Sequence, residues 1–333
     1  MTITHTSKRE MPSCDYEPKS YNGPAKEEVV ELRKRYCNPG VFTYYKDPLM
    51  LVDGHMQYLF DEKGQRYLDF FAGIVPVSCG HCHPKVLEKT KKQMETLQHA
   101  TTIYLHPSFG EFARKLAEKL PGELEVAYFV NSGSEANDLA MTMAQLYTGN
   151  YDILALNNCY HGAISSVMGL TSHHTWKYPI PQGQGVHHVA CPDPFRSNFS
   201  GSPEEIARKR VRDIEETVQC STPGKIAGFI AEPIQGVGGT TYGDANYLQL
   251  AFDAAREAGG ICIADEVQTG FGRTGDHYWG FEGYGVVPDI VTMAKGIGNG
   301  VPLAAVVTRK EIADTLKQRI HLNTYGGNPV SMA

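Results

Sequence analysis

VAYFVNSGSEANDLAMTMAQLY, residues 126–147, combines a short apolar strand, a tight turn and an amphipathic helix. The run Val126–Val130 is apolar without interruption, as in a strand that is covered on both faces. Ser132 and Glu135 have the spacing of a capping box, and Gly133 permits a tight turn before the helix. One face of the helix predicted over Glu135–Tyr147 carries apolar residues at helical spacing, namely Ala136, Leu139, Ala140, Met143 and Ala144. This unit predicts an α/β protein.

The same alternation continues along the chain. A second amphipathic helix is predicted over Tyr247–Ala258. Further short apolar runs, each the length of a strand, are Ile153–Leu156, Ile226–Ala231, Ile261–Ala264, Ile290–Ala294 and Leu303–Val307. Apolar strands separated by helices predict a mostly parallel sheet with helices on both faces. In such a sheet, ligands bind beyond the carboxyl ends of the strands.

The N-terminal part of the chain has a different sequence pattern. We expect residues 1–65 to form an arm with short strands, and residues 66–333 to form one large domain. A helix is predicted over Ala25–Tyr36, and strands over Met50–Val52, Tyr58–Asp61 and Tyr67–Phe71. The stretch 328–333 looks like the opening of a helix with nothing after it, so we expect the chain to stop early.

The composition indicates which class of molecule the chain binds. The formal net charge of −6 gives no basic footprint for nucleic acid or an anionic membrane, so a small-molecule substrate is expected. No run approaches eighteen consecutive apolar residues, so no span of a bilayer is predicted. Eight scattered cysteines favour reduced thiols in an intracellular compartment. The first 19 residues lack a secretory signal and fit a mitochondrial transit peptide poorly.

Three features at strand ends carry chemistry. Free N–H groups at the start of the helix after Val130 would suit a phosphate, although a capped helix alone is more often structural. Asp265 ends a buried strand and therefore needs a cationic partner, which is either a pyridinium nitrogen or a nearby Lys or Arg. Lys295 also ends an apolar strand, and poor solvation would lower its pKa and favour Schiff-base formation.

Considered together, the three features favour a cofactor site over the structural alternative that each one has by itself. Pyridoxal phosphate needs partners for its phosphate, its ring nitrogen and its aldehyde, and one parallel sheet offers all three here. No metal site is predicted. The glycines after Lys295 follow the spacing G-x-G-x-G and lack the dinucleotide fingerprint, so an NAD-dependent oxidoreductase is a weak alternative. Cys79-Gly80-His81-Cys82 has the spacing of redox thiols, but a turn before a helix is the preferred interpretation.

The chain resembles the class III aminotransferases of fold type I from about Pro39 to its last residue. The motifs that carry the resemblance are Gly80–Pro84, NSGSEAN at 131–137, Tyr160-His161-Gly162, Glu232–Gly236, ADEVQTGFGRTG at 264–275, MAKGIGNG at 293–300 and Asn323–Pro329. Within the family, Phe70–Val75 and the residues around these motifs are most similar to the mitochondrial alanine–glyoxylate members. The family's C-terminal small domain is expected to be missing beyond Ala333.

The resemblance implies roles for ten residues. Lys295 would form the Schiff base with pyridoxal 5'-phosphate, and Asp265 would pair with its ring nitrogen. The other residues implied to bind the cofactor are Gly133 and Ser134 at the phosphate, Tyr160 and Val267 on the two ring faces, His161, Gln268 at the phenolic oxygen, Glu232 in support of that network, and Thr324 at the cofactor of a neighbouring subunit. A homodimer is therefore implied.

The resemblance also implies a reaction. An amino donor, L-alanine or 3-aminoisobutyrate, would pass its amino group to glyoxylate or pyruvate in a ping-pong reaction through pyridoxamine phosphate. Ala163 and Val237 stand where some relatives carry an arginine and a glutamate that gates a second arginine. The alternative is a silent chain that binds cofactor or dimerises with intact subunits. The implied compartment is the mitochondrion, with the cytoplasm as the alternative.

Overall fold

The computed structural model describes residues 11–196, 198–244 and 246–333, which divide into two compact units. The first unit comprises the described residues up to Ile74 together with Cys79–Glu88, and the second comprises Val75–Ser78 and Lys89–Ala333. No helix in the described ranges is both long and apolar enough to cross a bilayer.

The first unit is built on a small antiparallel sheet. Its strands pair in the order β1-β2-β3, and Tyr58 and Phe60 of the middle strand are buried. The imidazole of His81 contacts the Asp69 carboxylate at 2.7 Å, and His81 also forms a backbone bridge with Met56. The elements of this unit are α1 (Lys26–Tyr36), β1 (Leu51–His55), β2 (Tyr58–Asp61) and β3 (Arg66–Leu68). Helix α2 (Pro84–Thr96) begins directly after the Gly-His-Cys-His motif, as the turn-before-helix interpretation expected.

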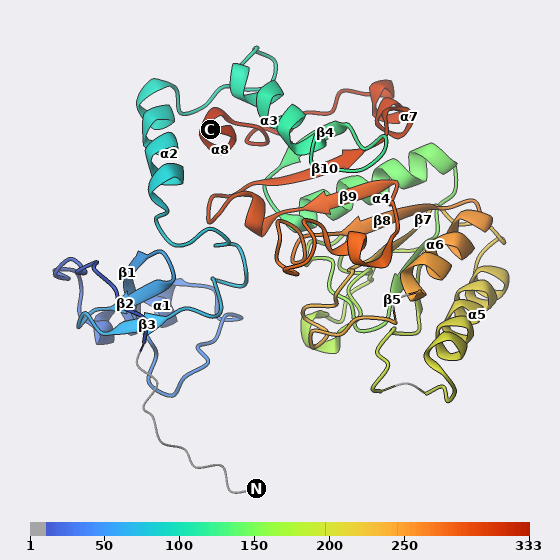
Figure 1. Ribbon diagram of the computed structural model, residues 1–333, viewed down its shortest axis with the longest axis horizontal. Coiled ribbons are helices and arrows are strands. Elements are labelled where there is room, and N and C mark those ends of the chain that lie inside the picture. The colour runs from blue at the N-terminus through green and yellow to red at the C-terminus, as the bar shows by residue number, and fades with distance from the viewer. Residues whose placement is uncertain (1–10, 197, 245) are drawn as a thin grey trace, which may run out of the picture. The chain divides into compact units, whose positions relative to one another are not determined.

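The second unit contains a seven-stranded sheet in the order β4-β10-β9-β8-β7-β5-β6 (Figure 1). Its strands are β4 (Val126–Val130), β5 (Ile153–Leu156), β6 (Val186–Val189), β7 (Gly228–Ala231), β8 (Ile261–Asp265), β9 (Ile290–Met293) and β10 (Ala304–Thr308). Neighbouring strands from β9 to β6 are parallel, so the predicted mostly parallel sheet is confirmed. Strand β10 runs antiparallel to both β4 and β9. The chain between β9 and β10 is too short for a crossover helix, which explains the reversal.

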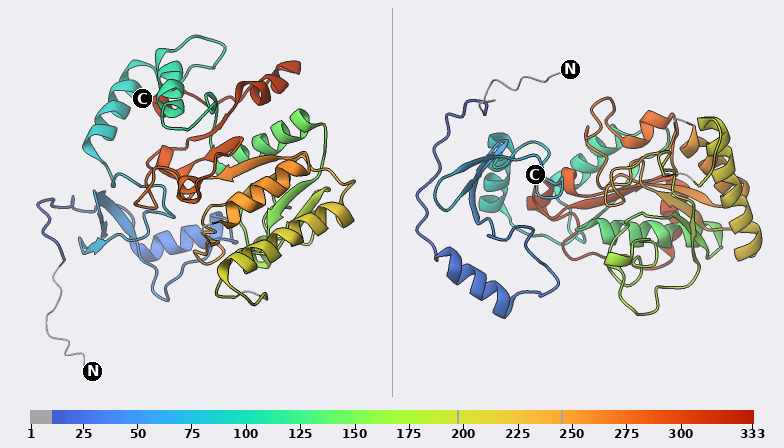
Figure 2. Two further views of the ribbon diagram at one scale, coloured as in Figure 1. Left: turned by 45° about the vertical axis from the view of Figure 1, so that its right-hand side comes forward. Right: turned by 90° about the horizontal axis from the view of Figure 1, so that it is seen from below.

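Helices cover both sides of this sheet (Figure 2). Helix α4 (Gly133–Thr148) lies on one side, and α5 (Pro203–Ser221) and α6 (Tyr247–Glu257) lie on the other. Right-handed crossovers give this arrangement. Helix α4 connects β4 to β5 in one direction across the sheet, whereas α5 and α6 connect β6 to β7 and β7 to β8 in the opposite direction. The remaining helices are α3 (Pro107–Ala117), α7 (Lys310–Ala313) and α8 (Pro329–Met332), with four short 3₁₀ turns between elements.

The sheet order explains where a site can form. Strand β4 is antiparallel to β10, which is antiparallel to β9, so β4 points the same way as β5 to β9. The carboxyl ends of these six strands therefore share one edge of the sheet. The residues that follow β4, β5, β7, β8 and β9 include most of the predicted site residues.

Helix α5 begins with a complete capping box. Ser202 Oγ accepts a hydrogen bond from Glu205 N at 3.3 Å, and Glu205 Oε2 accepts one from Ser202 N at 2.8 Å. The helix buries one face, which consists of Ala207, Arg210, Val211, Ile214 and Val218. The cap and this face together fix where the helix starts.

Replacement of Ser202 by alanine removes the N-cap acceptor of α5. We expect Ser202→Ala to lower the free energy of unfolding by about 1 kcal/mol. Ser202→Asp, which keeps an acceptor, should stay within a few tenths of wild type. The midpoints of chemical unfolding measure both effects. Equal stability of the alanine variant and wild type would contradict the role of this cap.

Candidate functional site

A cavity of about 180 Å³ lies in the second unit and brings nine of the ten predicted site residues together. It is lined by Gly133, Ser134, Asn137, Tyr160, His161, Gly162, Glu232, Asp265, Val267, Gln268, Ala294 and Lys295. These residues follow five strands whose carboxyl ends share one edge. The tenth predicted residue, Thr324, is exposed in the bend before α8 and does not line this cavity.

The start of helix α4 forms one wall of the cavity. Ser132 Oγ accepts a hydrogen bond from Glu135 N at 3.2 Å, as predicted. The other half of the predicted capping box is wrong, because the Glu135 carboxylate accepts from Asn131 N rather than from Ser132 N. Among the described residues, the N–H groups of Gly133 and Ser134 have no acceptor. Two backbone donors and the positive end of the helix are therefore available for an anion.

The carboxylate of Asp265 lies at the end of β8 and is only 3% exposed. Its Oδ2 atom accepts hydrogen bonds from His161 Nδ1 at 2.7 Å and Asn137 Nδ2 at 2.8 Å, and Oδ1 accepts from Val267 N at 3.1 Å. The partner is therefore a histidine rather than the Lys or Arg that the sequence suggested as the structural alternative. Three donors compensate for the removal of this carboxylate from water.

The imidazole of His161 is buried completely against Asp265. Burial alone would lower the pKa of His161, but Cys159 and the hydrogen bond with Asp265 raise it well above the ordinary value. The raised pKa favours the protonated form of His161, because the Asp265 carboxylate beside it stabilises a positive charge.

Lys295 follows β9 by two residues and reaches the cavity from a strained backbone. Its φ angle of 50° lies in the left-handed region, which is sparsely populated by residues other than glycine. Burial lowers the pKa of Lys295, although Asp265 and Glu232 act in the opposite direction. No carboxylate of the described residues lies within ion-pair distance of Nζ. A larger share of this amine is thus neutral than for a lysine in water.

Glu232 follows β7 and supports two loops at the cavity. Its Oε1 atom accepts a hydrogen bond from Tyr160 N at 2.9 Å, and Oε2 accepts one from Gly236 N at 3.1 Å. Burial raises the pKa of Glu232 to about 7, while His161 acts to lower it. Burial therefore favours the protonated form of this carboxyl group more than water does.

Three glycines keep the cavity open. A Cβ atom on Gly133 would come within 3.1 Å of the Val267 methyl groups. One on Gly162, whose φ is +129°, would lie 2.4 Å from Ser134 Oγ, and one on Gly236 would lie 2.3 Å from the Gln268 amide. A side chain at any of the three would displace a residue that lines the cavity.

Four residues at or behind the cavity were given no role from the sequence, namely Asn137, Gly162, Ala294 and Thr292. Asn137 is the last residue of the NSGSEAN motif and lies one helical turn after Gly133, so its spacing could have placed it at the cavity. Thr292 is the one polar residue in the apolar run Ile290–Ala294, which was also a usable signal. It is fully buried behind the cavity, and its hydroxyl donates to Asn137 Oδ1 at 2.7 Å.

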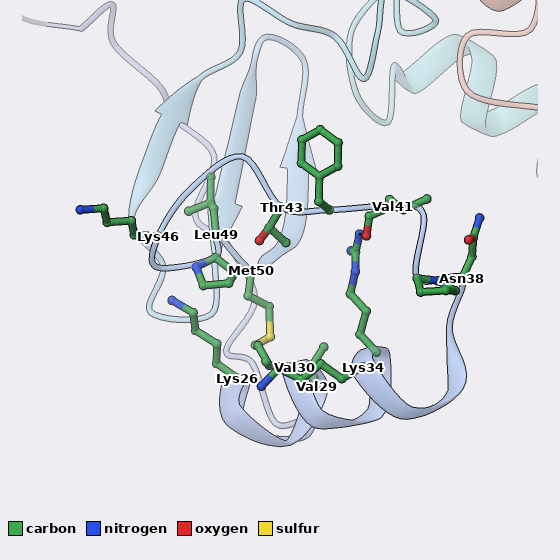
Figure 3. A pocket seen from close by; sticks show the side chains of 14 residues that line it. Lys26, Val29, Val30, Lys34, Asn38, Val41, Thr43, Lys46, Leu49 and Met50 are labelled. Atoms are coloured by element: carbon green, nitrogen blue, oxygen red, sulfur yellow. Dashed lines mark hydrogen bonds between the residues drawn. The ribbon is translucent and has the colours of Figure 1, made fainter. Parts of the chain in front are cut away.

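A larger cavity of about 620 Å³ lies within the first unit, between α1 and the loop 38–50 (Figure 3). Its wall combines apolar residues such as Val29, Val30 and Met50 with basic ones such as Lys26 and Lys46. No carboxylate and no histidine lines it. The smaller cavity of the second unit is the better candidate for chemistry, because it combines a buried acid, an amine and free backbone donors.

The weaker, NAD-dependent interpretation of the sequence does not fit the structure. The glycine cluster after Lys295 forms a 3₁₀ turn that leads into the antiparallel strand β10, whereas a dinucleotide loop would lead into a crossover helix. In the described part of the chain, no three His, Cys, Asp or Glu side chains come together as a metal site requires.

Comparison with known proteins identifies the family. The family model for "Aminotransferase class-III" matches residues 44–333. The chain belongs to the class III aminotransferases. The predicted resemblance is thereby confirmed.

The relatives extend this result. The chain is 52% identical to "Alanine--glyoxylate aminotransferase 2 homolog 2, mitochondrial" of Arabidopsis thaliana, over 96% of this chain and 66% of that protein. It is 47% identical to "Alanine--glyoxylate aminotransferase 2, mitochondrial" of Homo sapiens, over 99% of this chain and 68% of that protein. The chain thus spans about two thirds of the length of these relatives.

Solved structures of similar proteins share the fold. A thermostable (S)-enantioselective omega-transaminase from Thermomicrobium roseum superposes with a TM-score of 0.87 at 35% identity, over 94% of this chain and 73% of that chain. An amine transaminase from an uncultivated Pseudomonas species, in its "PLP-bound (internal aldimine) form", superposes with a TM-score of 0.82 at 30% identity, over 90% of this chain and 72% of that chain. The α/β fold of pyridoxal-phosphate-dependent transaminases is therefore confirmed.

The cavity fits the family cofactor, pyridoxal 5'-phosphate. The N–H groups of Gly133 and Ser134 suit its phosphate, the Asp265 carboxylate suits a protonated ring nitrogen, and the Lys295 amine suits its aldehyde. The close approach of Gly133 to Val267 and of Gly162 to Ser134 leaves room for a flat ring where side chains would otherwise fill the cavity.

A second buried acid stands directly beside Asp265 and points away from the cavity. Glu266 accepts hydrogen bonds from Gly280 N, Phe281 N and Thr269 Oγ1, at 2.9, 2.8 and 2.7 Å. Burial nevertheless raises the pKa of Glu266 to about 7 from 4.5. At a pH between these two pKa values, Glu266 therefore keeps its proton in the folded protein and loses it in the unfolded chain.

This difference predicts a pH dependence of stability. Since the folded state binds more protons between pH 4.5 and about 7, stability falls as the pH rises through this window. Glu266 accounts for about 3 kcal/mol of the fall. We expect thermal melts between pH 5 and 7 to show a smaller slope for Glu266→Gln. Glu257→Gln on the exposed face of α6 is the matched control, and equal slopes in all three proteins would contradict this assignment.

Proposed function

We propose that the site transfers an amino group from a donor to a small keto acid, with pyridoxal 5'-phosphate as cofactor. The observation that carries the proposal is the meeting of Lys295, Asp265 and the start of α4 in one cavity. The donors that fit the relatives' names and the resemblance are L-alanine and 3-aminoisobutyrate, and the acceptors are glyoxylate and pyruvate. All the lining residues fall within residues 66–333, which supports this part as the cofactor-binding domain.

The bound cofactor would supply an electron sink for the electrons that the substrate releases when its α-hydrogen leaves as a proton. Lys295 would provide the amine that holds the cofactor, and the same amine would accept this proton, since burial lowers its pKa. Asp265 holds a positive charge at the ring nitrogen, supported by His161. Tyr160 and Val267 cover the two ring faces.

The remaining residues orient the cofactor. Gln268 would donate to the phenolic oxygen, and Glu232 holds the Tyr160 and Gly236 loops through backbone hydrogen bonds. Gly133 and Ser134 bind the phosphate at the positive end of α4. These roles agree with positions on the five strand ends, and each can be tested by substitution.

The visible spectrum tests the proposal directly. Purified protein mixed with pyridoxal phosphate should develop a yellow band, which L-alanine should bleach and glyoxylate should restore. Lys295→Ala should abolish the reaction, and Asp265→Asn should slow it by at least about a hundredfold, because the charge at the ring nitrogen is lost. Asp253→Asn on α6 is a matched surface control. A yellow band that ignores every amino donor would contradict transamination and leave a silent cofactor-binding chain.

We also propose a homodimer in which Thr324 reaches the cofactor of the neighbouring subunit. Thr324 is exposed, and large apolar side chains near it in the second unit are exposed as well: Ile103, Tyr104, Leu105, Ile320, Leu322 and Tyr325. The segments 100–110 and 323–327 lie side by side, because the backbone of Gly327 packs against Phe109. Exposed apolar side chains gathered in neighbouring segments favour an interaction site.

Mixed dimers test this arrangement. In a dimer of one Lys295→Ala chain and one Thr324→Ala chain, one of the two sites would contain both native residues, so activity should return to about half that of wild type. Neither homodimer should regain it. The measurement is L-alanine turnover after co-expression with two different purification tags. If mixed dimers stay as inactive as the Lys295→Ala homodimer, Thr324 does not act across an interface.

We propose the mitochondrion as the compartment. The support is the word "mitochondrial" in the names of the plant and human relatives.

A further inference from the structure

Behind the cavity, a chain of buried hydrogen bonds leads from β9 to Asp265. Thr292 Oγ1 donates to Asn137 Oδ1 at 2.7 Å, and Asn137 Nδ2 donates to Asp265 Oδ2 at 2.8 Å and to the His161 carbonyl at 2.9 Å. Thr292 is 0% exposed and Asn137 is 1% exposed. Asn137 lines the cavity, whereas Thr292 lies one layer behind it.

The chemistry of the partners fixes the orientation of the Asn137 amide. The Asp265 carboxylate and the His161 carbonyl can only accept, so the NH₂ group must face both of them. The carbonyl Oδ1 must then face Thr292, whose hydroxyl has to donate. Without that hydroxyl, Oδ1 would be buried with no donor, and a rotated amide would turn its oxygen toward Asp265.

The same contacts connect the two ends of the proposed cofactor site. Asn137 belongs to α4, whose first turn offers the N–H groups of Gly133 and Ser134 to a phosphate. Thr292 pairs with Asp265 in the parallel register of β8 and β9, and its carbonyl accepts a hydrogen bond from Glu266 N at 2.9 Å. The amide of Asn137 therefore ties the helix to the strand that carries the ring-nitrogen partner.

We propose that Thr292 is a positioning residue for the reaction. It fixes the Asn137 amide and thereby keeps Asp265 oriented, as a carboxylate, toward the ring nitrogen of pyridoxal phosphate. The inference rests on the proposed function, because it concerns the same cavity. The charged and titratable groups around Asp265 are His161, Glu232 and Lys295 at the cavity, and Glu266, whose carboxylate points away from it. Two of these are acids, so a neutral donor such as Asn137 adds support that does not depend on their protonation.

Binding of two ligands to the full chain tests the proposal. Thr292→Val replaces the hydroxyl by a methyl group of similar size. We expect the Kd of pyridoxal phosphate to rise about tenfold, since a donor to a buried charged group is misplaced. For an analogue whose ring nitrogen is replaced by carbon, which keeps the aldehyde and phosphate, Kd should differ less than about twofold between wild type and Thr292→Val.

Two further variants separate positioning from general damage to the fold. Thr292→Ser keeps the hydroxyl and should restore the affinity for pyridoxal phosphate. Thr308→Val removes another fully buried hydroxyl, that of the last residue of β10, which donates to the Asp289 carbonyl; it should leave this affinity unchanged. Thermal melts of the cofactor-free proteins show how much stability each substitution removes.

The outcomes are distinct. Equal weakening of both ligands by Thr292→Val, or an unchanged Kd for pyridoxal phosphate, would overturn the positioning role. If wild type binds pyridoxal phosphate but turns over no amino donor, the proposed transamination fails while the positioning role is still measured by Kd. If wild type does not bind pyridoxal phosphate at all, both proposals fail together with the cofactor site.

Discussion

The buried carboxylate of Asp265 is the interaction on which the arrangement of the cavity depends. A carboxylate that is 3% exposed is stable only when donors surround it, and here they come from the loop after β5, from α4 and from the turn after β8. The segments of two of these donors also shape the rest of the cavity. His161 and Gly162 carry the loop that covers Ser134, and Asn137 belongs to the helix whose first turn offers the anion-binding N–H groups. One charge thus holds three separate segments of the site in register.

The parallel sheet makes this convergence possible. Strand β8 lies between β7 and β9, so the residues that follow these three strands, Glu232, Asp265 and Lys295, lie side by side at one edge. The reversal at β10 then brings β4 into the sheet in the same direction as β9, which places the start of α4 at that edge as well. A topology in which β10 ran parallel would have required a crossover helix directly after Lys295.

The sequence predicted the parts of this site that local patterns control. Val126–Val130 and Ile153–Leu156 match the observed strands in full because uninterrupted apolar runs are specific to strands buried on both faces. The partner of Asp265 was not predicted, since His161 lies 104 residues earlier in the chain and its position depends on a loop with no regular structure. Strand β6 was not singled out, because His187 and His188 interrupt its apolar pattern.

The surroundings of Lys295 explain how its pKa can be lowered beside two acids. Asp265 attracts the ammonium form of Lys295, and its carboxylate also lies against the His161 imidazole at 2.7 Å. Glu232, with a pKa raised to about 7, is a full anion in only part of the molecules at neutral pH. Desolvation therefore outweighs the remaining attraction, and the pKa of Lys295 falls. An isolated Asp265 and an ionised Glu232 would together have stabilised the ammonium form, which cannot act as a nucleophile.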